Sequence, residues 1–259
     1  MKKQELGSAN CPVLYVGGPG TGKTAKIKAS YDALVELYGP RLMPESLSGT
    51  AIPVTLEDST AIERRLFPEE LYNLYQDAKA GKSTAVFIDE IDKTHERVSD
   101  TLLSFIQDRK LGPVKLHPTT HIIAAANPPS NGGRVGRLSE PLLNRFCIRN
   151  WELTPEEWVA WAEKQPELQT PEIHSVLGGV LAGSIQMYDD VGTVSELTYR
   201  CNTPRSLHKA LLLIAEGKVD WVDGLVTPSA NTQIGYLVAT SDSGTLEDIV
   251  DDTFGSVFK

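Results

Sequence analysis

The chain carries a glycine-rich run at positions 17–24, which follows an apolar stretch and precedes a helical pattern. Glycine lets successive backbone N–H groups turn inward around an anion, while the following helix N-terminus adds partial positive charge. The run therefore predicts a cradle for a triphosphate. Lys23 is expected to reach the outer phosphates, and the Thr24 hydroxyl is expected to bind the accompanying Mg²⁺. The predicted phosphate-binding residues are Gly18, Pro19, Gly20, Thr21, Gly22, Lys23 and Thr24.

Two adjacent acids, Asp89 and Glu90, follow the apolar run at 84–88. Ligands bind at the carboxyl ends of parallel strands, so both acids are expected beside the glycine loop. Asp89 is predicted to hold Mg²⁺ of the bound nucleotide, directly or through water. Glu90 is predicted to orient or deprotonate the water that attacks the terminal phosphate. The alternative is a pair of helix-capping acids at a strand end.

Asn127 ends a second buried apolar run, at 119–126. Its amide can donate to a phosphate oxygen and accept from the attacking water, which makes it a candidate catalytic residue. An asparagine before a proline is also common in turns, so the residue type alone leaves both interpretations open.

Two arginines are candidates for contact with the nucleotide. Arg145 ends a short helical pattern, and its guanidinium could stabilise transition-state charge on a neighbouring subunit's nucleotide. A surface salt bridge is the alternative for Arg145. Arg205 lies near the start of a capped helix, from which it could sense the state of the nucleotide. Three further arginines compete with Arg145 for its role, namely Arg134, Arg137 and Arg149.

Hydrophobic periodicity predicts alternating strands and helices up to about residue 152. Strands are expected at 12–16, 52–56, 84–88, 119–126 and 146–148, with a small hairpin at 110–116. The apolar residues Ile27, Tyr31, Leu34, Val35 and Tyr38 predict a first helix that ends at Gly39. The pattern indicates an α/β fold with three layers.

A different pattern, with helix after helix, begins after residue 152. Threonine followed by proline occurs at 154–155, 170–171 and 203–204, and each pair can cap a helix. Trp158 and Trp161 are expected to anchor the core of this region. We therefore expect an α/β nucleotide-binding domain at 1–152, a helical lid at 153–223 and a C-terminal segment at 224–259. Apolar residues at helical spacing from Leu246 onward predict a helix in this segment, which either packs against the lid or docks a partner.

Composition narrows the function classes. The 259 residues carry a net charge of −9, which argues against a general nucleic-acid or anionic-membrane surface. The three cysteines show no disulfide or metal spacing, and no run of eighteen apolar residues is present. A cytoplasmic protein is the expectation.

Five motifs, in their order and spacing, resemble those of the AAA+ ATPases, and they are most similar to the MoxR-like branch. They are the glycine loop and the segments 86–90, 125–128, 143–146 and 203–205. They match the family's Walker A, Walker B with its glutamate, sensor 1, arginine finger and sensor 2 arginine. The resemblance implies a P-loop NTPase domain with a five-stranded parallel sheet, a helical lid, and Mg-ATP bound between subunits of a ring, usually a hexamer. It also implies remodelling of a partner protein, often one with a von Willebrand factor A domain.

Two departures from the family pattern limit which functional residues of the family can be assigned in this sequence. Few residues precede the first expected strand, so the sequence identifies no adenine-binding residue. The stretch 57–65, where the pore-facing loop should fall, contains no aromatic side chain to grip a threaded polypeptide. Two other functions stay open at this point: a DNA-directed motor or loader, and a nucleotide switch that does not hydrolyse.

Overall fold

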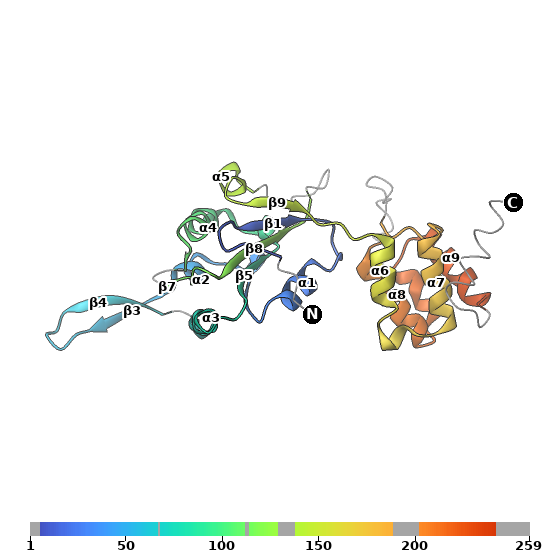
Figure 1. Cartoon of the computed structure of the whole chain (residues 1–259), viewed down its shortest axis with the longest axis horizontal. Helices are drawn as coiled ribbons and strands as arrows, with labels where there is room; N and C mark the ends of the chain where they lie inside the picture. Colours follow the sequence, from blue (N-terminus) through green and yellow to red (C-terminus); the bar gives the residue numbers. More distant parts are fainter. Residues whose placement is uncertain (1–5, 67, 112–113, 129–137, 189–201, 242–259) are drawn as a thin grey trace. The chain divides into compact units, whose positions relative to one another are not determined.

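A computed structural model describes residues 6–66, 68–111, 114–128, 138–188 and 202–241. The chain divides into two compact units, which are described separately (Figure 1). The first comprises Met1–Gly18 and Gly22–Trp151, and the second comprises Pro19–Thr21 and Glu152–Lys259.

The first unit is built on a five-stranded sheet, as expected. Its strands are β1 (Val13–Val16), β2 (Ala33–Tyr38), β5 (Thr84–Asp89), β8 (His121–Ala126) and β9 (Cys147–Asn150). Their order is β2-β5-β8-β1-β9, and every neighbouring pair is parallel. The carboxyl ends of all five strands therefore lie along one edge of the sheet.

Both faces of this sheet are buried, which explains the continuous apolar runs in its central strands. On β5, Val86 and Ile88 belong to one core cluster, whereas Ala85 and Phe87 belong to another. The first cluster includes α3 (Glu69–Lys79), α4 (Glu96–Asp108) and α5 (Glu140–Leu143). The second includes Ile27 of α1 (Lys23–Ser30). Helices thus cover both sides of the sheet, and the expected three-layer α/β fold is confirmed.

The long first helix expected from periodicity is wrong. The helix ends at Ser30, and Ala33–Tyr38 form β2 instead. Pairing supplies the reason, because β2 provides hydrogen-bond partners for the buried strand β5 along its full length. The turn is fixed at Asp32, whose backbone N–H donates to the Ser83 carbonyl (2.9 Å) while its carboxylate accepts from the Ser83 N–H (3.1 Å).

The strand expected at 52–56 exists but does not join the main sheet. It is β3 (Thr50–Thr55), which pairs with β4 (Ala61–Leu66) in an antiparallel ribbon that projects from the first unit (Figure 1). The polar stretch at 57–65 therefore forms the turn and second strand of this ribbon. The fifth strand of the sheet is instead β2.

The remaining elements of the first unit are short. They are α2 (Pro44–Ser48), the 3-10 helices η1 (Gly39–Arg41) and η2 (Ile91–Lys93), and the hairpin strands β6 (Lys110–Leu111) and β7 (Val114–Lys115). The hairpin between α4 and β8 agrees with the sequence prediction.

The second unit is helical. It contains α6 (Pro155–Ala162), η3 (Pro166–Leu168), α7 (Pro171–Leu181), α8 (Pro204–Ala215), η4 (Val219–Gly224) and α9 (Pro228–Ala239). The side chains of Thr154 and Thr203 cap α6 and α8 as expected, whereas that of Thr170 makes no capping bond to α7. Ala230 and Ile234 of α9 pack in the same core as α6–α8, so this helix belongs to the helical unit. The helical pattern expected from residue 246 onward lies outside the described residues.

The two tryptophans of α6 differ in their burial. Trp158 is buried, but Trp161 is 41% exposed and contacts the His208 ring edge-on, with the ring centroids 4.9 Å apart. The expectation that both anchor the core is wrong for Trp161, because it lies outside the buried stripe that Trp158, Val159 and Ala162 form on this helix.

Membrane-spanning helices are absent from the described ranges, in which no helix combines the necessary length and apolar character.

Replacement of Phe87 by alanine should strongly destabilise the first unit. The Phe87 side chain projects from β5 and is fully buried in the cluster that includes Ile27 of α1. Its removal leaves a cavity and should cost about 3–5 kcal/mol of unfolding free energy. Urea unfolding followed by circular dichroism measures this. Tyr72→Ala is the matched control, because Tyr72 is 63% exposed and its loss should change stability by less than about 0.5 kcal/mol. Equal effects of the two substitutions would contradict the described core.

Candidate active site

The glycine loop connects β1 to α1 at the carboxyl edge of the sheet. Gly20 and Gly22 have φ angles of 75° and 77°, a left-handed conformation that glycine adopts without steric cost. Gly22 is the N-cap of α1 and makes no side-chain capping bond, and the first turn of the helix has no acidic residue. The first N–H groups of a helix have no intrahelical acceptor, so this terminus is suited to an anion.

Lys23 is buried within the loop that it follows. Its ammonium group donates to the carbonyl oxygens of Gly17 (2.6 Å) and Gly18 (2.8 Å) and to the side-chain oxygen of Asn127 (3.4 Å). The positive charge is therefore held inside the cradle, between the end of β1 and the end of β8. A phosphate there would meet a lysine that is already in place.

Thr24 and Asp89 are joined by a hydrogen bond across 65 positions of sequence. The Thr24 hydroxyl donates to Oδ2 of Asp89 at 2.7 Å. Hydroxyl and carboxylate oxygens are hard ligands, which Mg²⁺ prefers, and Mg²⁺ in nucleotide sites uses few protein ligands besides phosphates and water. This pair of oxygen donors, directly beside the phosphate cradle, fits the predicted metal site.

Glu90 occupies a strained position at the end of β5. Its φ is 51°, which is uncommon for a residue with a side chain, and such backbone strain is concentrated at functional sites. Gly39 makes this conformation possible, because a Cβ at Gly39 would lie 2.3 Å from the Glu90 carbonyl oxygen.

Two donors fix the Glu90 carboxylate. The Tyr38 hydroxyl donates to Oε2 at 2.9 Å, and the Lys93 ammonium pairs with Oε1 at 3.0 Å. Parallel pairing explains the first contact, since Tyr38 at the end of β2 is in register with Asp89. The hydrogen bond to Glu90 is the main reason why the pKa values of Tyr38 and Lys93 both lie above their ordinary values.

Asn127 is held by a buried carboxylate. Its backbone N–H donates to Oδ1 of Asp92 at 3.3 Å, and Asp92 is only 4% exposed. Burial raises the pKa of the Asp92 carboxyl. Asn127 is therefore bonded to Lys23 through its side chain and to Asp92 through its backbone.

Arg145 does not join this network in its own chain. Its guanidinium donates to the side-chain oxygen of Gln107 on α4 (Nη2, 2.7 Å; Nε, 3.3 Å) and to the Pro141 carbonyl (Nη1, 2.6 Å). Of its competitors, Arg149 is exposed on the edge strand β9, whereas Arg134 and Arg137 lie outside the described residues. Arg205 is exposed in the first turn of α8, in the second unit.

The structure thus brings together Lys23, Thr24, Asp89, Glu90 and Asn127, all of which the sequence suggested. Four supporting residues were missed: Tyr38, Gly39, Asp92 and Lys93. The pair Gly39-Pro40 was interpreted as a helix stop, and the third acid in the segment 89–92 was the signal that could have identified Asp92.

The comparison with known families agrees with this geometry. The family model described as "ATPase family associated with various cellular activities (AAA)" matches residues 13–151. This match covers more than half of the chain and contains every residue of the network. The chain belongs to the AAA family of ATPases. Its reaction is therefore the hydrolysis of ATP, and the family match implies that the chain binds the nucleotide.

Comparisons with solved structures and with curated proteins give less information about this chain. Among solved structures, this AAA ATPase is similar to a chain described as a "putative ATPase from Cytophaga hutchinsonii ATCC 33406", with 15% sequence identity and a TM-score of 0.43. The similarity covers 95% of this chain and 85% of the other. None of the curated proteins matches the sequence.

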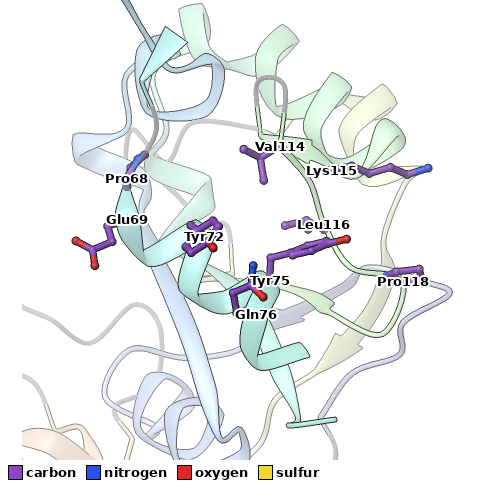
Figure 2. Close-up of a pocket in the computed structure, with 9 residues that line it drawn as sticks. All are labelled: Pro68, Glu69, Tyr72, Tyr75, Gln76, Val114, Lys115, Leu116 and Pro118. Carbon is purple, nitrogen blue, oxygen red and sulfur yellow. The ribbon is translucent and has the colours of Figure 1, made fainter. Parts of the chain in front are cut away.

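A separate hollow of about 630 Å³ lies between α3 and the β6–β7 hairpin (Figure 2). Tyr72 and Tyr75 of α3 and Leu116 after β7 line it, and Lys115 lies at its rim (Figure 2). Aromatic and aliphatic walls of this kind suit an apolar side chain of a polypeptide rather than a phosphate. The residues that line this groove are distinct from the network around Lys23 and Asp89.

The Tyr38 phenol should titrate at higher pH than an ordinary tyrosine. Its neutral form donates to Glu90, and ionisation would place a phenolate beside a carboxylate, so the pKa is raised. The bond therefore stabilises the folded state below the phenol's ordinary pKa and is lost as pH rises through the raised value. Glu90→Gln should lower the Tyr38 pKa toward its ordinary value.

Carbon-13 NMR of ring-labelled tyrosines across the alkaline range measures this pKa, and Tyr38→Phe assigns the signal. An identical Tyr38 pKa in the wild type and in Glu90→Gln would show that the two side chains do not interact in solution.

Proposed function

We propose that this AAA ATPase forms a ring, most simply a hexamer, in which Mg-ATP hydrolysis remodels a partner protein. The observation that carries the proposal is the position of Arg145. All its described hydrogen bonds are to α4 and α5, away from the network around Lys23 and Asp89. An arginine that stabilises transition-state charge is often supplied by another molecule, and a neighbouring copy of this chain can supply it in a ring.

Within one chain, we assign the roles as follows. The loop amides and Lys23 bind the phosphates, Glu90 orients and deprotonates the attacking water, and Asn127 positions that water. Thr24 and Asp89 are the residues that would hold Mg²⁺. When bound, Mg²⁺ neutralises charge on the phosphate oxygens. Arg205 of the helical unit is proposed to respond to the nucleotide.

A protein client is supported by two exposed apolar features of the first unit. The β3–β4 ribbon places the half-buried Ile52, Val54 and Ile62 on one face, which Arg64 and the 56% exposed Leu66 share. An isolated two-stranded ribbon is marginally stable in water, so a partner that covers this face would stabilise it. The groove beside α3 is the second feature. The ribbon has no aromatic residue, which favours reshaping of a folded client over threading.

The resemblance of the five sequence motifs to those of the MoxR-like branch suggests the class of client. We propose a protein that carries a von Willebrand factor A domain. The net charge of −9 favours a protein client over DNA, because a DNA-directed motor needs clustered cations to neutralise phosphates.

Glu90→Gln tests the hydrolytic role and can capture the client. Removal of the general base should reduce phosphate release by about 10²–10⁴-fold, because proton transfer contributes that much. ATP affinity should be unchanged, since Lys23 and the loop remain. A pull-down with this variant and ATP should retain the client, which mass spectrometry identifies. Normal turnover in Glu90→Gln would remove Glu90 from the mechanism, and recovery of DNA instead of protein would contradict the client proposal.

Arg145→Ala tests whether active sites are shared between subunits. Turnover should fall by about 10³-fold or more while ATP affinity is kept. Co-expression of Arg145→Ala with Glu90→Gln should restore part of the activity, because a mixed ring contains sites with an intact arginine from one subunit and an intact glutamate from the next. Arg149→Ala is the matched control and should stay active. Two inactive variants that never complement each other would contradict a shared site.

A further inference from the structure

The order of the strands determines on which side of the glycine loop the base of ATP leaves the site. Asp89 ends β5, Glu90 follows it, and Asn127 follows β8, so the groups proposed to act on the terminal phosphate lie on one side of β1. The strand on the other side of β1 is β9. We therefore expect an extended nucleotide whose reacting end faces β5 and β8 to place its nucleoside end toward β9.

Trp151 is the first residue after β9 and lies directly against the loop. Its backbone N–H donates to the Val16 carbonyl at 2.7 Å. A Cβ at Gly17 would lie 2.3 Å from the Trp151 carbonyl oxygen and 2.8 Å from its Cβ. Glycine at 17 therefore permits a close approach between the loop and this tryptophan, whose position is fixed by β9.

The indole ring contacts a rigid neighbour and a flexible one. Tyr15 contacts it edge-on, with the ring centroids 5.1 Å apart and an interplanar angle of 86°. The Tyr15 hydroxyl is itself anchored by a hydrogen bond to the Leu6 carbonyl at 2.9 Å. The Lys26 ammonium lies 5.4 Å from the centre of the indole ring. Lys26 is exposed, and its four-carbon chain can move away at little cost.

We propose that Trp151 binds the base of the nucleotide, which stacks on the indole ring in place of Lys26. The face of an aromatic ring can stack with any nucleobase. Stacking on a ring that is already fixed gives a larger binding free energy, because no mobile side chain has to be ordered. This inference rests on nucleotide binding at the glycine loop. It identifies a base-binding residue, which the sequence alone did not.

Trp151→Ala and a ligand without a base test the proposal. Isothermal titration calorimetry on the full chain compares Mg-ATP with inorganic triphosphate. Trp151→Ala should weaken ATP binding by about tenfold or more, the range expected for loss of one stacked base, and should leave inorganic triphosphate binding unchanged. Trp151→Phe should retain ATP affinity within about threefold, because the smaller ring still stacks.

Trp221→Ala is the matched control. Trp221 is 67% exposed in the second unit and also has a lysine ammonium, that of Lys218, over its ring at 5.8 Å. Its loss should not affect either ligand. If Trp151→Ala weakens ATP and triphosphate equally, the residue only supports the loop, and the proposal is wrong. Unchanged ATP binding in Trp151→Ala would also overturn it. Wild-type protein that binds neither ligand would overturn nucleotide binding itself.

Discussion

The hydrogen bond between Thr24 and Asp89 is the contact on which the rest of the site depends. It joins the first turn of α1 to the end of β5, although β8 lies between β1 and β5 in the sheet. The 2.7 Å contact between these side chains is possible because β1 and β5 end at the same edge of the sheet and the glycine loop after β1 curves back over that edge. Parallel pairing of five strands provides that alignment. The fold thus places the side-chain oxygens of Thr24 and Asp89 and the buried Lys23 at one edge of the sheet.

Neighbouring residues fix the positions of Glu90 and Asn127 in this site. Tyr38 and Lys93 restrain the Glu90 carboxylate, and the absence of a side chain at Gly39 leaves room for the Glu90 carbonyl. Asp92 performs the same task for the backbone of Asn127. Since a catalytic group is effective only when it is held in the reacting geometry, these neighbours are as informative about mechanism as the acids themselves.

Much of the site could be predicted from the sequence, because its main residues occur in short motifs at strand ends. Lys23, Thr24, Asp89, Glu90 and Asn127 were found in this way, and the family match covers all of them. Tyr38 could not be found, since it reaches Glu90 only through the pairing of β2 with β5. The same pairing explains the error at 33–38, where apolar residues fit a helical period but form a strand. Local periodicity cannot show which buried strand still needs a hydrogen-bond partner.

The β3–β4 ribbon can change in evolution independently of the five-stranded sheet. It leaves the α/β layers after α2 and returns to them at α3, and its strands pair with each other rather than with the sheet. Insertions, deletions or changes of charge in the ribbon would leave the hydrogen bonds around Asp89 intact. With the client binding that we propose for this ribbon, two descendants of one ancestor can therefore acquire different specificities while they keep the same residues around Asp89.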